Sequence, residues 1–328
     1  MATDLQETVK GLPKPWGFVR LEVSWEGLRR MRRLVIGTRG SRLALVQARE
    51  VSRALSTASS GLEIVLREIT TAGDRDRTRS IPSMGETGVF VREIERALLA
   101  GEVDVAVHSL KDLPVEQPAG LMVGATPVRG DPRDVLACRE ASGFDDLPQG
   151  ARVGTSSVRR AAQLLALRDD LDVQPIRGNV DTRLDKLARG DYDAIVVARA
   201  ALDRLGRAEA CTELLAPEVF LPAPGQGALA VEVREGDLDV LRHVASINDT
   251  TTFVTTHAER DVLSRLGGGC HLPLGALAEA ASDGTFVLRA VLLSEDGRRA
   301  VRAEATGTME DPGEVVDIIV RQLSEREI

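Results

Sequence analysis

The chain has 328 residues, enough for two or three domains, and its net charge of −8 argues against non-specific binding to nucleic acid. Aromatic residues make up only 3% of it, which argues against a base-stacking surface, and no apolar run approaches the roughly 20 residues that span a bilayer. The first residues lack the apolar segment of a secretory signal, so we expect a cytoplasmic protein.

Residues 1–32 show no clear periodicity, and we expect them to form a poorly ordered N-terminal extension. From residue 33 onward strands and helices alternate. The first block is predicted to hold strands at 33–38, 62–70 and 103–110 and helices at 41–55 and 88–102. The second block is predicted to hold strands at 151–157 and 171–178, helices at 157–170 and 179–190, and a strand that runs into a helix at 192–206. Such βαβ repeats predict parallel sheets with right-handed crossovers.

The two blocks predict two α/β domains. We assign the first to residues 33–128 plus 226–246 and the second to 132–222, with chain crossings near 127–134 and 220–233. After residue 248 the pattern changes to a helix that ends at glycines, a hairpin around a Ser-Glu-Asp-Gly turn, and a final helix. Residues 248–328 therefore form a small α+β domain in this prediction.

Four strand-to-helix loops, at 38–42, 108–112, 154–160 and 177–183, carry hydroxyl and basic side chains. In open α/β sheets ligands bind at the carboxyl ends of the strands, where helix N-termini offer free backbone N–H groups. Any one loop also fits ordinary helix caps and solvated arginines, but the recurrence favours a ligand site. The predicted anion site is lined by Arg39, Arg42, Arg159, Arg160, Arg177 and Arg183. No nucleotide-binding glycine motif occurs, and the site suits a polycarboxylate.

Asp112 lies among these basic residues, where we expect an ionised carboxylate. Such a group can stabilise a cation or accept and return a proton, although a cap or an arginine partner is the alternative role. His108 lies on the preceding apolar strand, and we favour a packed, hydrogen-bonded histidine over a catalytic one.

Cys270 follows three glycines and precedes His271, and four roles are open for it: metal ligand, nucleophile, buried thiol or point of attachment. Adjacent residues rarely converge on one metal, and zinc would need two further ligands. A nucleophilic thiol would need a base, and none is evident in the sequence. The three cysteines are too widely spaced to indicate a disulfide framework.

The stretches GTRGSRLAL, HSLKDLPVE, GDPRDVL, GTSSVRRAAQL, IRGNVDTRLDKL, LPAPGQGALAVE and SRLGGGCHLPLG occur in this order. Together they resemble the hydroxymethylbilane synthase family, also called porphobilinogen deaminases, and the resemblance runs from about residue 33 to the C-terminus. It implies two periplasmic-binding-protein-like α/β domains with crossing linkers and a small α+β C-terminal domain. No metal, nucleic acid or membrane is implied as a partner, and we expect a monomer.

The resemblance also implies the reaction. Members of the family join four porphobilinogen molecules head to tail, release ammonia at each addition, and hydrolyse the product off as linear hydroxymethylbilane. The growing chain is held on a dipyrromethane cofactor, bound through a thioether to the cysteine that corresponds to Cys270. The catalytic aspartate corresponds to Asp112. Each pyrrole carries an acetate and a propionate, which fits an arginine-rich site.

By position, the resemblance assigns further residues. The residues assigned to bind the cofactor carboxylates are Ser109, Lys111, Ser157, Arg159, Arg160 and Arg183. The residues assigned to contact the substrate are Arg39, Ser41, Arg177, Arg204 and Gln226, and Phe90 is expected to pack on a pyrrole ring. One departure concerns the usual loop lysines, because Ser83 and Thr87 occupy their positions and Glu86 adds a negative charge. We expect this loop to hold carboxylates less firmly.

Two other classes of function fit parts of the sequence. Two α/β domains with crossing linkers also describe a non-catalytic binder of a small polyanion. An acyl-transfer enzyme that uses Cys270 is the second alternative. A thiol in a glycine loop argues against the binder, and the lack of a base argues against acyl transfer.

Overall fold

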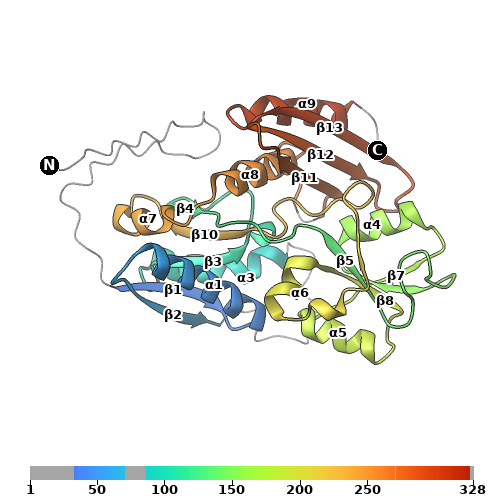
Figure 1. Cartoon of the computed structure of the whole chain (residues 1–328), viewed down its shortest axis with the longest axis horizontal. Helices are drawn as coiled ribbons and strands as arrows, with labels where there is room; N and C mark the ends of the chain where they lie inside the picture. The colour runs from blue at the N-terminus through green and yellow to red at the C-terminus, as the bar shows by residue number, and fades with distance from the viewer. Residues whose placement is uncertain (1–32, 71–85, 270, 326–328) are drawn as a thin grey trace.

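The computed structural model describes residues 33–70, 86–269 and 271–325, with the backbone alone for 86–90. Three sheets organise this part of the chain (Figure 1). The predicted N-terminal extension at residues 1–32 lies outside the described residues.

The first sheet has the strand order β2-β1-β3-β10-β4. Its strands are β1 (Arg33–Arg39), β2 (Glu63–Ile69), β3 (Val105–Ser109), β4 (Leu121–Ala125) and β10 (Leu229–Arg234). β1 pairs in parallel with β2 and β3, whereas β10 runs antiparallel between β3 and β4. The helices of this part are α1 (Arg42–Ala58), α3 (Glu86–Leu99) and α7 (Leu238–Ala245). Apolar side chains of α1 and α7, such as Val51 and Val240, pack on one face of the sheet, and Ile94 and Leu98 of α3 lie in a separate buried cluster with Ala106.

The second sheet repeats this arrangement in the order β7-β6-β8-β5-β9. Its strands are β5 (Asp134–Cys138), β6 (Arg152–Gly154), β7 (Asp172–Gln174), β8 (Ala194–Ala198) and β9 (Glu213–Leu214). The helices are α4 (Val158–Leu167), α5 (Val180–Ala188) and α6 (Arg199–Leu205). In both sheets the fourth strand, β10 or β5, is antiparallel to its neighbours and begins just after the chain has crossed from the other sheet.

The third sheet is an antiparallel meander of β11 (Leu274–Ala280), β12 (Thr285–Leu293) and β13 (Ala300–Thr308). The helices α8 (Thr250–Arg265) and α9 (Pro312–Ser324) share a buried core with this sheet, in which Phe286, Val316 and Ile319 are fully buried. Other side chains of the sheet, such as Leu277 and Val291, pack with Ala162 of α4. The third domain therefore contacts the second directly.

The two crossings pass against each other at two glycines. The N–H of Gly130 donates to the carbonyl of Gly227, 3.2 Å away. A Cβ on Gly227 would lie 2.5 Å from the Gly130 carbonyl oxygen, and its φ of +90° is also unfavourable for other residues. Glycine is thus required where the two connections between the α/β domains meet.

The predicted fold class is confirmed, with parallel strands in the first two sheets and a small α+β unit at the C-terminal end. The predicted helix at 88–102 ends at Leu99, followed by Gly101 with a φ of +69°. The sequence prediction missed β4, β5, β9, β10, β11 and α7; it had assigned most of β10 to the return crossing at 220–233. The first three strands are short and lie beside or within connections, where apolar alternation is too brief to register. The domain bounds stay a proposal, supported by the place of β10 in the first sheet.

Candidate active site

The four loops predicted to bind an anion follow the carboxyl ends of parallel strands. They follow β1 and β3 in the first sheet and β6 and β7 in the second. Three of them lead into helices with side-chain caps: the hydroxyls of Ser41 and Ser157 accept from the N–H groups of Ala44 and Arg160, and Asn179 caps α5. The caps fix where each helix begins, and hence where its basic residues lie.

Asp134 is the centre of a buried charge network that the sequence prediction missed. Its carboxylate is fully buried and lies 2.8 Å from Nη1 of Arg159 and 2.7 Å from Nη2 of Arg160. Burial alone would raise the pKa of Asp134, but Arg159 and Arg160 outweigh it and hold the pKa well below its usual range. These two arginines are therefore buried and oriented by a carboxylate of β5, rather than solvated on a loop. The only hint in the sequence was the GDPRDVL stretch.

Gln226 connects this network to Lys111. Its amide nitrogen donates to Asp134 at 2.9 Å and to the carbonyl of Pro132 at 2.7 Å, and its amide oxygen accepts from Nζ of Lys111 at 3.1 Å. The return crossing thus links the loop after β3 to the second domain. Burial lowers the pKa of Lys111 to about 8; Asp112 opposes this, and Arg160 adds to it.

Arg183 and Asp112 lie at the exposed side of the same cluster. Burial and the charge of Arg160 lower the pKa of Arg183, while Asp112 opposes the shift. Asp112 is exposed and interacts electrostatically with Lys111, from its own domain, and with Arg183, from the second. The cluster holds four basic side chains and two carboxylates: Lys111, Arg159, Arg160 and Arg183 with Asp112 and Asp134. Its excess of positive charge suits a ligand with carboxylates.

Two other predicted site residues, Arg42 and Arg204, bind groups outside this cluster. Arg42 donates to Asp181 at 3.1 Å and to the carbonyl of Leu205, so it joins the two α/β domains. Arg204 pairs with Glu50 at 2.8 Å and lines a cavity of about 430 Å³ beside the first crossing. Arg39 ends β1, and Arg177 is exposed in the loop before α5.

The strand β3 carries two further polar residues. The hydroxyl of Ser109 accepts from Nε2 of Gln47 at 2.8 Å. His108 is buried, with Nε2 3.3 Å from Oε2 of the fully buried Glu232 on β10. Glu95 of α3 interacts electrostatically with His108 and Glu232. Its pKa is raised, mainly by burial and secondly by the negative charge of Glu232. This environment favours the packed role predicted for His108 over a catalytic one.

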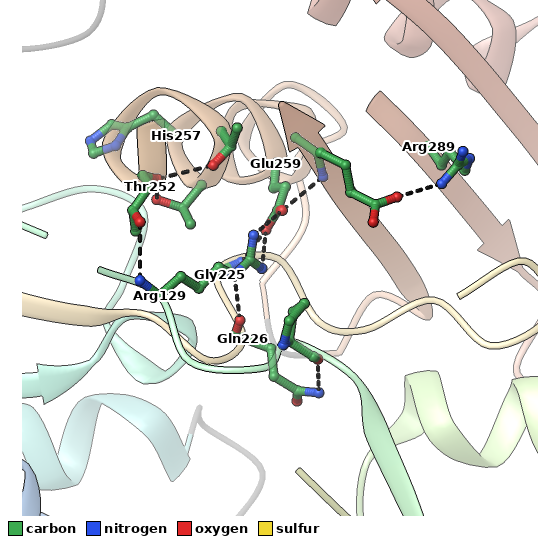
Figure 2. Close-up of polar contacts among 12 residues, drawn as sticks. Arg129, Gly225, Gln226, Thr252, His257, Glu259 and Arg289 are labelled. Atoms are coloured by element: carbon green, nitrogen blue, oxygen red, sulfur yellow. Dashed lines mark hydrogen bonds and ion pairs between the residues drawn. The ribbon is translucent and has the colours of Figure 1, made fainter. Parts of the chain in front are cut away.

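The helix α8 joins the third domain to both crossings through Glu259 (Figure 2). Arg129, on the first crossing, donates to the two carboxylate oxygens of Glu259 at 2.7 and 3.0 Å. Backbone N–H groups of Gly225, on the return crossing, and of Ala278, on β11, donate to the same oxygens at 2.7 and 2.8 Å. Nε of Arg129 also donates to the carbonyl of Gln226 at 2.8 Å. Sequence reasoning missed this pair, because its members lie far apart in the chain.

Two predicted positions cannot be placed. Cys270 and the side chain of Phe90 lie outside the described residues, as do Ser83 and the side chains of Glu86 and Thr87. Within residues 33–70, 86–269 and 271–325, no group of three or more His, Cys, Asp or Glu side chains is arranged to hold a metal ion. None of the helices in these ranges is both long and apolar enough for a membrane span.

The fold and site define a three-domain α/β protein with a cation-rich site where its first two domains meet. A family model described as "Porphobilinogen deaminase, dipyromethane cofactor binding domain" matches residues 34–242, and a second, "Porphobilinogen deaminase, C-terminal domain", matches residues 253–325. The chain belongs to the porphobilinogen deaminase family, also called hydroxymethylbilane synthases. It is therefore an enzyme of the transferase kind, from a family that uses a dipyrromethane cofactor.

Relatives named porphobilinogen deaminase are similar over most of the chain. The protein of Roseiflexus sp. (strain RS-1) is 49% identical over 279 residues, which cover 85% of this chain and 91% of the relative. That of Thermus thermophilus is 48% identical over 297 residues, or 90% and 97% of the two chains. Among solved structures, a TRAP periplasmic solute binding protein from Desulfovibrio salexigens aligns with 67% of this chain and 73% of its own, at 13% identity and a TM-score of 0.40.

Proposed function

We propose that this protein condenses four porphobilinogen molecules head to tail on a dipyrromethane primer bound to Cys270, and then releases linear hydroxymethylbilane by hydrolysis. One observation carries the proposal beyond family membership: the exposed carboxylate of Asp112 lies within electrostatic reach of cations from both α/β domains. A carboxylate beside a cluster that binds carboxylates is the arrangement that this chemistry needs.

The residues of the cluster fit a dipyrromethane, which carries four carboxylates. Basic side chains outnumber carboxylates in the described cluster, and Asp134 fixes two of them, Arg159 and Arg160. When bound, the cofactor supplies a fixed pyrrole end to which the next unit is added. We assign its carboxylates to Lys111, Arg159, Arg160 and Arg183, with the hydroxyls of Ser109 and Ser157 as further donors.

Asp112 has two tasks in this proposal. Its carboxylate stabilises the cation that forms when the aminomethyl arm of porphobilinogen loses ammonia. It then stabilises the positive charge that forms on the pyrrole ring which attacks this cation. It also accepts the α-proton that the attacking ring must lose and passes it to the released ammonia. Substrate carboxylates fall to Arg39, Ser41 and Arg177, which lie at or just after the carboxyl ends of strands. Phe90 stays proposed as a ring contact.

Arg204 and Gln226 have a narrower role in the proposal than in the sequence prediction. Both bind protein groups, Glu50 and Gly227 for Arg204, and Asp134 and Lys111 for Gln226. We propose that they reach substrate only if domain movement breaks these contacts. A cytoplasmic, monomeric enzyme without a metal completes the proposal. The monomeric state is supported by a site that one chain builds by itself, and light scattering of the purified protein checks it.

The variant Asp112→Asn tests the proposed function. It removes the charge but keeps the shape, so we expect the fold to persist while ammonia release from porphobilinogen falls about 100-fold or more. Glu116→Gln, an exposed carboxylate shortly after Asp112, is the matched control and should retain wild-type turnover. Wild-type turnover in Asp112→Asn would remove Asp112 from the proposed role.

A further inference from the structure

Arg260, on α8, is bound to the turn that carries Asp112. The residue is 7% exposed, and its guanidinium donates to the carbonyl oxygens of Leu110, Leu113 and Pro114 at 2.8, 2.9 and 2.7 Å. These carbonyls bracket Lys111 and Asp112 in the chain. A planar guanidinium presents its donors in a rigid fork and fixes such a set of acceptors in one geometry, whereas the rotatable donors of an ammonium do so less firmly.

The turn has little rigidity of its own. Leu110–Asp112 is a single turn of 3-10 helix, a form with poor hydrogen-bond geometry. Its backbone is tied by Leu110 N–H to the carbonyl of Ala228 at 3.0 Å, and by Leu113 N–H to Leu110 at 3.2 Å. The side chains of Leu110 and Leu113 are buried, whereas that of Asp112 is exposed. The three bonds from Arg260 are therefore a large share of what fixes the backbone of Asp112.

The helix α8 is itself fixed, one residue before Arg260. Glu259 binds both crossings and β11 through four hydrogen bonds. The same helix ends at Arg265 and leads through Gly267, Gly268 and Gly269 to Cys270. One rigid element thus connects the turn of Asp112 with the segment that precedes the proposed point of attachment.

We infer that Arg260 is a positioning residue, which sets the place of the Asp112 carboxylate relative to α8. The inference rests on the proposed function, because it gives Asp112 the catalytic role. A displacement of the carboxylate by a fraction of an ångström to an ångström would lower the rate of the chemical step, while the cations that bind carboxylates stay where they are.

The test compares Arg260→Lys and Arg260→Gln with Arg265→Gln, a control on the same helix whose partners Asp261 and Asp317 lie away from the turn. We expect Arg260→Lys to keep its cofactor and to have a KM within about twofold of the wild-type value. Its kcat should be about 10- to 100-fold lower than that of the wild type. The control should match wild type. If Arg260→Gln does not fold, Arg260→Lys decides alone.

A double variant separates positioning from general support of the fold. If Arg260 acts through Asp112, then Arg260→Lys should not lower the residual rate of Asp112→Asn any further. Equal losses in both backgrounds, a loss of cofactor in parallel with kcat, or an unchanged kcat in Arg260→Lys would each overturn the inference. Failure of the proposed function looks different, because wild-type protein would then release no ammonia from porphobilinogen.

Discussion

The side chain of Lys111 is half-buried and lies near Arg159 and Arg160. Burial lowers its pKa from 10.5 to about 8, with Arg160 and Arg159 adding to the shift and Asp112 opposing it. A charged lysine in such a place destabilises the folded protein without ligand, so its presence points to a functional requirement. The natural compensation is a bound carboxylate.

Lys111→Met in a Cys270→Ser background, which cannot hold the cofactor, should therefore be more stable than its parent. We expect a gain of about 1–2 kcal/mol at pH 7, because partial exposure of the lysine screens part of the cost. The unfolded chain holds the lysine proton up to about pH 10.5 and the folded chain releases it near pH 8. The parent then gains stability as the pH rises through this window, and the difference should shrink.

Urea unfolding at pH 7 and pH 9.5 measures both values. Lys186→Met is the control, because Lys186 lies on α5 and its Nζ donates to the carbonyl of Arg177 at the protein surface. This variant should show no gain in stability that fades as the pH rises. A Lys111→Met variant that is less stable than its parent at pH 7 would contradict this reading of the site.

Single residues also show where sequence reasoning ends. Ser41 and Ser157 were recognisable as caps from the chain alone, since the cap and its helix are adjacent. The role of Asp134 was not recognisable, because Asp134 follows a turn motif and its partners Arg159 and Arg160 come more than 20 residues later. Sequence placed the cations correctly after their strands, but not the carboxylate that holds them.

Among the elements, α8 is confirmed as the predicted helix that ends at glycines, but the contacts of its polar residues were not predicted. It is not amphipathic, and its buried residues include Thr256, Glu259 and Arg260 as well as apolar ones. A helix that contacts the third sheet, both crossings and the turn of Asp112 has no single solvent face, so its pattern carries no clear periodicity. The role of its charged residues depends on neighbours that only the folded chain brings together.

The pair of Arg129 and Glu259 gives a prediction for this element. Arg129→Met leaves the fully buried Glu259 carboxylate without its cation and should cost about 3–5 kcal/mol of the free energy of unfolding. Adding Glu259→Gln should recover part of that loss, because the uncompensated charge is removed.

An ion pair at the surface provides the comparison for the buried pair of Arg129 and Glu259. Arg289→Met breaks ion pairs with Glu279 and Glu304 on the exposed side of the third sheet, and should cost about 1 kcal/mol or less. Figure 2 shows Arg289 with one of these contacts. Denaturant unfolding of the three variants checks the order. Equal costs for Arg129→Met and Arg289→Met would mean that the buried pair does not hold the crossings to α8.

At the scale of the whole molecule, the two α/β domains share one strand order and meet at a site that neither completes alone. Lys111 and Asp112 come from the first, Arg159, Arg160 and Arg183 from the second, and Gln226 from the return crossing. Sequence predicted the two blocks from their βαβ rhythm. It could not predict how the crossings pack, since this depends on Gly130 meeting Gly227 and on Arg129 meeting Glu259.

The central claim is that Cys270 carries a pyrrole chain which this enzyme extends. Intact-mass measurement of the purified protein tests it most directly. We predict a covalent adduct of two pyrrole units, a series of heavier species with up to four more units after brief addition of porphobilinogen, and neither in Cys270→Ser. A folded wild-type protein of unmodified mass, which stays unmodified with porphobilinogen and releases no ammonia, would contradict the account.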